Sequence, residues 1–412
     1  MGSYLSWMDH SENARRKMLD IINLFSEKET RDELGIGSVR DAFSDLLFPG
    51  TSTIQTRAKY FLFVPWIYQI IEKKEIESAD VENYARKIEI RLIDSLMDSN
   101  DTQGVIGKQA RKNLQRLPSD IYWEGLKRLG ILLFRSSKEQ YHRSLDYFNL
   151  DKKEVYKGDG IFSSKDAESK FIEIKTNWHS GIPKVPNGFP NEVTLKLNKE
   201  EATYLAERIL YNASGTLFAF LIDQCSPWKE KYAFPWDHPC CRQLPSRIKE
   251  QIEHAQNFSM VMWGSALLYN LMLAEKLKSN DEIAKYKFLI KQDWWTMLEK
   301  RRSHLNNWRM EEFWQIARSE NPRISMLTQR FIETWIKIVL KSSDAKSIVS
   351  NEKARKLILE REKDLKGELA RLTNRRALEN WSGASGGAQI DYRWGKVQQI
   401  VLDILSGMKR KE

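Results

Sequence analysis

The feature that most constrains this fold is a long helical pattern whose centre carries no charge. Residues 246–278 keep apolar side chains at helical spacing, and every residue from Ala255 to Ala274 is uncharged. A stretch of this length could cross a bilayer. However, it contains Gln256, Asn257 and Asn270, and charged segments flank it on both sides. We therefore predict a buried helix and no membrane partner.

Most of the remaining sequence also favours helices. Asn198, followed three residues later by Glu201, is typical of a capping box that opens a helix. The glycine-rich run WSGASGGAQ at 381–389 predicts a turn between two helices. Together these patterns predict an α-rich chain, with further helices near 282–300, 305–319, 323–341, 349–378 and 394–408.

One stretch, residues 151–197, has a different pattern. Glu154–Phe162 and Lys170–Thr176 have the composition of strands, and the polar run SSKDAES joins them as a hairpin loop would. Val193–Leu197 alternates apolar and polar residues, which is typical of a half-buried strand. The predicted fold class is therefore mainly α, a multi-helix protein with a small β hairpin or sheet in the middle of the chain.

The length of the chain predicts more than one domain. A chain of 412 residues is too long for one compact core, because domains contain roughly 100–200 residues. The patterns divide the sequence into three regions. These are an N-terminal helical domain at 1–148 that could hold a helix-turn-helix-like unit, a mixed hairpin and helix region at 149–245, and a C-terminal helical domain at 246–412.

The three cysteines bear on localisation and on metal binding. Their odd, low number does not fit a disulfide framework, and the N-terminus lacks the apolar run of a signal peptide, so we expect a cytoplasmic protein. Cys225, His238, Cys240 and Cys241 could in principle bind zinc, but adjacent cysteines fit a tetrahedral site poorly. Buried or loop thiols explain them better. We therefore predict no metal site and no cofactor here.

A nuclease-like pattern lies in the predicted hairpin. Asp159 precedes Glu173 and Lys175, in the Asp…Glu-x-Lys order of restriction-endonuclease-like nucleases. Two carboxylates at one hairpin edge could bind Mg²⁺, and a neighbouring lysine could stabilise charge on a phosphate. The alternative is an exposed hairpin with a cross-strand charge pair, since Glu-x-Lys occurs three times in this chain. Mg²⁺ is expected only if the nuclease interpretation holds.

Basic residues cluster in two segments and suggest DNA or RNA as a partner. The net charge is +10, which favours polyanions. We expect one cluster on a helical face, before a segment that could belong to a helix-turn-helix-like unit. The alternative is a solvated surface with ion pairs such as Glu362–Lys366. The candidate nucleic-acid-binding residues are Lys108, Arg111, Lys112, Arg116, Arg371, Arg375 and Arg376.

Several enzyme classes lack support in this sequence. It contains no P-loop, no dinucleotide-binding glycine fingerprint, no Gly-x-Ser-x-Gly elbow and no HExxH motif. The run GASGG at 383–387 has no lysine of the phosphate-binding type. The motifs therefore do not identify an activity, and we favour a non-catalytic protein over an enzyme.

Four stretches together resemble an uncharacterised bacterial family known only as a domain of unknown function. They are FPGTSTIQTRAKYFLFVPWIY (48–68), the segment 107–131, LNKEEATYLAERI (197–209) and the segment 366–404. The resemblance covers nearly the whole chain. It implies a gene found in genomic defence islands, near helicase and phospholipase-D-like nuclease genes, and hence a role in multi-gene anti-phage defence. It supplies no catalytic motif that can be assigned to residues of this sequence.

These observations lead to one expectation about function and two alternatives. We expect a nucleic-acid-binding, non-catalytic subunit of a prokaryotic anti-phage defence system that works with a helicase or nuclease partner. The first alternative is a Mg²⁺-dependent nuclease that uses Asp159, Glu173 and Lys175. The second is a protein scaffold or sensor that does not contact DNA.

Overall fold

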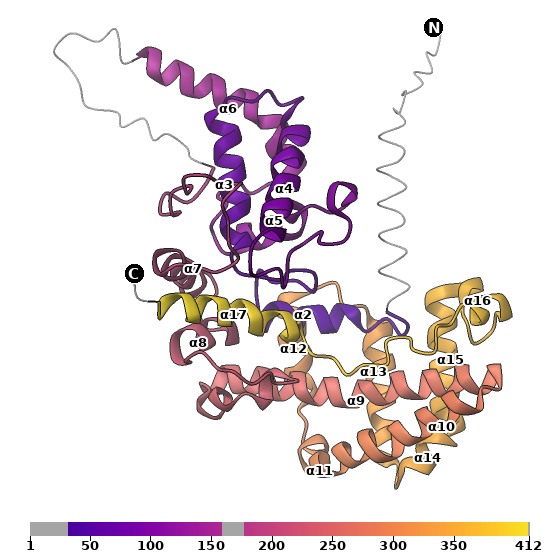
Figure 1. Ribbon diagram of the computed structural model, residues 1–412. Helices are drawn as coiled ribbons and strands as arrows, with labels where there is room; N and C mark the ends of the chain where they lie inside the picture. The colour runs from indigo at the N-terminus through magenta and orange to yellow at the C-terminus, as the bar shows by residue number, and fades with distance from the viewer. Residues whose placement is uncertain (1–31, 159–176, 411–412) are drawn as a thin grey trace, which may run out of the picture. The chain divides into compact units, whose positions relative to one another are not determined.

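The computed structural model describes residues 32–158 and 177–410, and helices dominate this part of the chain (Figure 1). The prediction of a mainly α protein is confirmed. Contacts divide the described residues into two units. Unit 1 combines the stretch that ends at Phe43 with Gln251–Ile390, and unit 2 combines Ser44–Glu250 with the stretch that begins at Asp391. The three consecutive regions expected from the sequence stay a prediction.

Unit 1 is organised around the long helix α9 (Ser246–Leu277), whose apolar centre is buried as the sequence predicts. Two tryptophans fix its neighbours, because the Nε1 atoms of Trp294 and Trp335 donate to the carbonyl oxygens of Met260 and Val261, each at 2.9 Å. A Cβ atom at Gly264 would lie 2.1 Å from the Trp294 ring, so only glycine permits this approach. No helix of the described residues is long and apolar enough to cross a bilayer.

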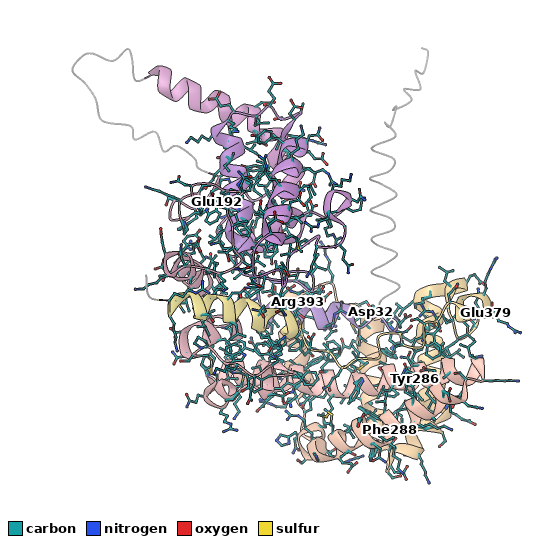
Figure 2. The ribbon with its side chains drawn as sticks, in the orientation of Figure 1. Asp32, Glu192, Tyr286, Phe288, Glu379 and Arg393 are labelled. Carbon is teal, nitrogen blue, oxygen red and sulfur yellow. A yellow bond between two sulfur atoms is a disulfide. The ribbon has the colours of Figure 1, made fainter. Side chains whose placement is uncertain are left out.

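The helices of unit 1 fill the space between them with side chains (Figure 2). They are α2 (Gly37–Leu47), α9 (Ser246–Leu277), α10 (Asn280–Phe288), the π-helical turn η4 (Leu289–Trp294), α11 (Trp295–Asn306), α12 (Met310–Glu320), α13 (Met326–Lys341), α14 (Ala345–Val349), α15 (Glu352–Lys366), the 3₁₀ turn η5 (Gly367–Leu369) and α16 (Arg375–Glu379). The first residues of α9 and the last of α2 are counted with unit 2.

The glycine-rich run after α16 is a loop that binds to α9. The side chain of Asn270 accepts from the Ser385 amide and donates to the Ser385 carbonyl oxygen, both at 2.8 Å. It also accepts from Trp381 Nε1 at 3.2 Å, and Trp263 Nε1 donates to the Gly387 carbonyl oxygen at 2.8 Å. Buried polar groups need such partners, so the polar residues of this apolar helix are the ones that hold the loop.

Unit 2 brings together stretches that resemble the uncharacterised family. Arg57 donates to Asp403 at 2.8 Å, and Lys59 forms a buried ion pair with Glu201. Glu201 also closes the predicted capping box with Asn198, which is confirmed. These charged side chains therefore stabilise the fold of unit 2.

The helices of unit 2 are α3 (Tyr60–Lys73), α4 (Val81–Met97), η1 (Arg111–Asn113), α5 (Pro118–Arg128), α6 (Lys138–Gly158), α7 (Lys199–Asn212), α8 (Leu217–Gln224), η2 (Pro235–Asp237), η3 (Pro239–Gln243) and α17 (Trp394–Met408).

The predicted β hairpin or sheet is wrong for the residues that the structure describes. Helix α6 continues to Gly158 through the start of the first predicted strand. Helix elongation adds one hydrogen bond per residue and needs no neighbouring strand. Residues 193–197 do alternate in burial, but side chains take their carbonyl oxygens, since Arg410 donates to that of Leu197 at 2.8 Å. In the described part of the chain, β-type pairing is limited to an isolated antiparallel bridge between Leu132 and Trp178.

The single helix predicted at 349–378 is also wrong, because the chain forms α15 and α16 with a break between them. Gly367 adopts a positive φ of 52°, which ends α15. Glu362 explains the path that follows. Its carboxylate accepts from the amides of Arg371 and Leu372, each at 2.9 Å, and from the Tyr269 hydroxyl at 2.6 Å. The expected Glu362–Lys366 ion pair is therefore not formed.

Candidate nucleic-acid interface

The first predicted basic cluster lies on a loop, residues 107–116, which we call the basic loop. The helix predicted there is wrong, since the residues form turns and the short 3₁₀ helix η1. Gly107 and Arg111 adopt positive φ angles of 78° and 48°. An α-helix cannot continue through left-handed residues. The cations therefore reach the surface from a folded loop instead of from one face of a helix.

Neighbouring helices fix the backbone of the basic loop. Where the loop begins, the Ile106 amide donates to the hydroxyl of Tyr60 on α3 at 2.9 Å. Within the loop, Arg86 on α4 donates to the carbonyl oxygen of Lys112 at 2.8 Å. The side chain of Leu114 is half-buried and turns away from the solvent. The loop is thus held at its start and in its middle by groups that do not belong to it.

The cationic side chains of the basic loop differ in their partners. Arg111 pairs with Asp94 on α4 at 3.0 Å. Lys108, Lys112 and Arg116 are exposed, and none of these three has an acidic partner among the described residues. Among the described residues, the only hydrogen bond from these three side chains joins Lys108 Nζ to Thr102 Oγ1 at 3.3 Å. Three positive charges are therefore available on one short, fixed segment.

The expected helix-turn-helix-like unit does not form from the basic segment, because only its second helix, α5, exists. Sequence preference would make Ser119 the cap of this helix, but α5 begins one residue earlier, at Pro118. The cap is instead provided by Asp120, whose carboxylate accepts from the Leu117 amide at 2.8 Å. The Ser119 amide donates to Glu89 at 3.2 Å. A helix pair that could enter a DNA groove is absent from 107–131.

Glu89 is a buried carboxyl group on α4, at the start of α5. Its side chain is fully buried, and Oε2 has no hydrogen-bond partner among the described groups. Burial raises the pKa of Glu89 to about 7, although Lys138 and the Ser119 hydrogen bond oppose the shift. Glu89 thus differs from the exposed acids of unit 2, and sequence patterns give no sign of it.

The second predicted cluster, in unit 1, splits between the interior and the surface. Arg371 donates to Glu33 at 2.6 Å and to the Ser385 hydroxyl at 2.9 Å, so it belongs to an internal network. Arg375 and Arg376 are exposed on α16, where Arg375 pairs with Glu379 at 3.3 Å. Within this cluster, the surface position that the prediction needs is found only for these last two residues.

The predicted nuclease residues Asp159, Glu173 and Lys175 lie outside the described residues. Their convergence, and any site for Mg²⁺ that they would form, stays a prediction.

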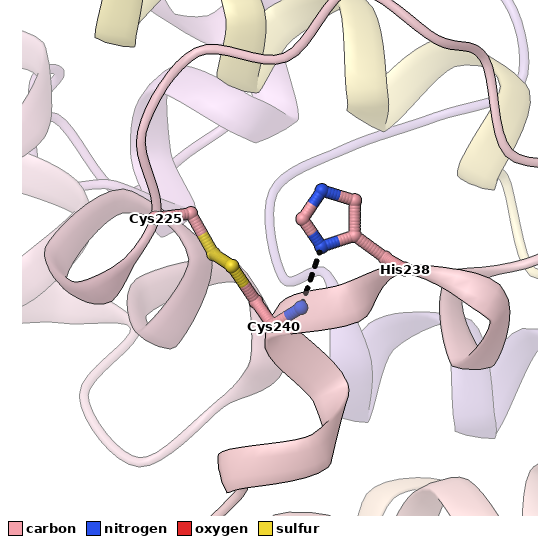
Figure 3. Close-up of side chains that lie close together, drawn as sticks. All are labelled: Cys225, His238 and Cys240. Carbon is pink, nitrogen blue, oxygen red and sulfur yellow. Dashed lines mark hydrogen bonds between the residues drawn. A yellow bond between two sulfur atoms is a disulfide. The ribbon is translucent and has the colours of Figure 1, made fainter.

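Three of the four residues considered for zinc lie together in unit 2 (Figure 3). One ligand atom each of Cys225, His238 and Cys240 lies within 4.8 Å of the others. Cys225 and Cys240 are recorded as a disulfide. Cys241 is excluded from the group, because its Sγ donates to the Pro235 carbonyl oxygen at 3.0 Å. The sequence indicated these residues, but the adjacent cysteines Cys240 and Cys241 and the long gap after Cys225 argued against a tetrahedral site.

Comparisons with known proteins identify a family but no characterised relative. No curated protein and no solved structure matches this chain. A family model matches residues 2–406, which is nearly the whole sequence. The chain therefore belongs to DUF6361, a family of unknown function.

Proposed function

We propose that this protein is a nucleic-acid-binding, non-catalytic subunit of a prokaryotic multi-gene anti-phage defence system, working with a helicase or nuclease partner. The observation that carries the binding part is the basic loop, where Lys108, Lys112 and Arg116 are exposed and have no acidic partner in residues 32–158 and 177–410. The defence context rests on the sequence resemblance alone.

The chemistry of the basic loop supports contact with phosphates more than with bases. Lysine and arginine neutralise phosphates and release counterions, which gives affinity without reading sequence. No helix of the loop is available to enter a major groove, because η1 contains only three residues. The protein would therefore bind DNA or RNA with little sequence preference, as a subunit that holds nucleic acid for a partner enzyme.

A fixed loop favours this role over a merely solvated surface. Ordering a flexible lysine-rich segment on binding would cost free energy, which a preorganised backbone avoids. The hydrogen bonds from Ile106 to Tyr60 and from Arg86 to Lys112 supply that order before any ligand arrives.

The test is binding of the full chain to labelled duplex and single-stranded DNA across a salt series. We expect affinity for duplex DNA to fall with salt, with a slope of about −0.9 on a log–log plot for each phosphate neutralised. A variant with Lys108, Lys112 and Arg116 changed to alanine should lower the affinity about 100-fold and reduce the slope by about 2.7.

A matched control removes the same charge from another surface. Lys337, Lys341 and Lys346 are exposed in unit 1, and changing all three to alanine should leave the slope nearly unchanged. If both variants lost the same affinity, the loss would be due to net charge alone, and this would contradict a binding site on the basic loop. No binding by the unchanged protein would favour the scaffold. Mg²⁺-dependent cleavage that is lost in Glu173→Ala would favour the nuclease.

A further inference from the structure

Two cysteines and a histidine meet at the end of α8, although the sequence separates them. Cys225 is the C-cap residue of α8, Cys240 lies in η3, and His238 directly precedes η3. The short helix and the 3₁₀ turns bring their ligand atoms within 4.8 Å of one another. A set of two thiol sulfurs and one imidazole is a ligand set that zinc prefers.

The surroundings of His238 are typical of a metal ligand and not of a residue that only fills space in the core. Its imidazole is buried, and Nε2 has no hydrogen-bond partner among the described groups. Nδ1 accepts only a long bond, 3.3 Å, from the Cys240 amide. Buried polar atoms usually have partners. The disulfide does not explain why a buried imidazole beside two sulfurs has a nitrogen, Nε2, without a hydrogen bond among the described groups.

Three aromatic rings pack close to the imidazole of His238. The ring centroids of Trp228 and Tyr232 lie 4.3 Å and 4.9 Å from that of His238. Trp394 on α17 donates from Nε1 to the Tyr232 carbonyl oxygen at 3.0 Å. In metal sites, an apolar shell of this kind controls solvent access and the local dielectric.

We propose that Cys225, His238 and Cys240 bind one Zn²⁺ ion when the two cysteines are reduced. The disulfide and the metal site are alternative states of the same sulfurs. A dithiol reductant breaks the sulfur–sulfur bond by supplying two electrons and two protons, and is itself oxidised to a disulfide. Zinc then replaces the two thiol protons, which pass to the solvent. Three protein ligands leave water in the fourth position.

The ion would fasten the segment between α8 and η3. That segment carries Trp228 and Tyr232, which pack near Trp394 of α17. Metal binding to the folded state alone stabilises the protein by mass action. Zinc would therefore raise the melting temperature of the reduced protein, and a chelator would lower it.

The experiment measures zinc in the full chain, purified with a thiol-free phosphine reductant and dialysed against buffered zinc. We expect about one zinc ion per chain, and loss of that zinc in His238→Gln and Cys240→Ser. Cys241→Ser is the matched control and should keep the ion, since Cys241 lies next to the site but points its thiol at Pro235.

A cobalt titration of the unchanged protein tests the ligands without a variant. Two thiolate ligands should give a charge-transfer absorption in the cobalt-loaded protein. Reduced protein that holds no stoichiometric zinc would overturn the proposal. So would a cobalt spectrum without thiolate absorption, or zinc retained equally in Cys240→Ser and Cys241→Ser.

Discussion

Two basic segments of similar charge, one in each unit, differ in how many of their cations form ion pairs with buried acids. Residues 366–376 of unit 1 and the basic loop of unit 2 each carry four lysines and arginines. In unit 1, Lys366 and Arg371 both pair with Glu33. Of the four cations of the basic loop, only Arg111 has an acidic partner in the described part of the chain. Segments of similar charge therefore differ in role: the cations of unit 1 form internal ion pairs that stabilise the fold, and those of the basic loop remain available to bind a ligand.

The difference lies in what approaches each segment. Glu33 reaches Lys366 and Arg371 from more than three hundred positions earlier in the chain, within the same unit. Burial, together with the charge on Arg371, lowers the pKa of Lys366 to about 8. No described acid reaches Lys108, Lys112 or Arg116 in this way. A charge is available for binding only where the fold brings no counter-charge.

The strongest way to break the comparison is to remove the acid that neutralises the unit 1 segment. Glu33→Ala would leave Lys366 and Arg371 largely buried without their partner. Breaking a buried pair in this way costs about 3–5 kcal/mol of unfolding free energy. Urea unfolding followed by circular dichroism measures this loss.

Glu379→Ala is the control for Glu33→Ala. Glu379, labelled in Figure 2, is 60% exposed, and its one ion pair within the described residues is with Arg375 on the surface of α16. Its removal should change the free energy by less than about 0.5 kcal/mol. Equal effects of the two variants would show that the Glu33 network does not stabilise unit 1.

The next test concerns the buried acid beside the basic loop. The pKa of Glu89 is raised to about 7 from its ordinary value of 4.5, so the folded state holds the proton more tightly than the unfolded state. The stabilisation from this proton is complete below about pH 4.5 and is lost as the pH rises to about 7. The loss is at most about 3 kcal/mol over that window.

Glu89→Gln isolates this contribution, because glutamine keeps the shape of a carboxyl group that cannot ionise. Between pH 5 and pH 7.5, the unfolding free energy should fall less in this variant than in the unchanged protein. The exposed Glu124 on α5 provides the control, and Glu124→Gln should keep the original pH dependence. Identical pH profiles for all three proteins would mean that Glu89 is ionised in the fold.

The smallest expected effect sharpens the comparison by adding a free cation. Asp94→Asn removes the partner of Arg111, and both side chains are already well exposed. We expect duplex affinity to rise a few-fold and the salt slope to steepen by up to about 0.9, as for one further phosphate contact. Asp98→Asn removes a nearby negative charge without releasing a loop cation, so it should leave the slope unchanged. A lower affinity of Asp94→Asn would show that the pair orders the loop for binding.

Local patterns predict those features that depend on neighbours in the sequence. The buried helix α9, the capping box of Asn198 and Glu201, and the last helix Trp394–Met408 follow from spacing and composition. Patterns fail where distant groups intervene. The alternation at 193–197 is present in burial, yet Arg410 takes a carbonyl oxygen that a neighbouring strand would need. Local patterns also fail for the candidate sites, because they indicate the basic residues but do not predict which acidic residues pair with them.

The sequence by itself determined that this chain is helical, basic and a member of one family. Helical periodicity and caps are local, so their free energies are set by residues three or four positions apart. Only the tertiary structure decided that Arg371 is neutralised by Glu33, that three cations of the basic loop meet no acid among the described residues, and that Cys225 meets His238. Each of these depends on which side chains approach from far along the chain, because Coulomb energy and ligation follow distance in space.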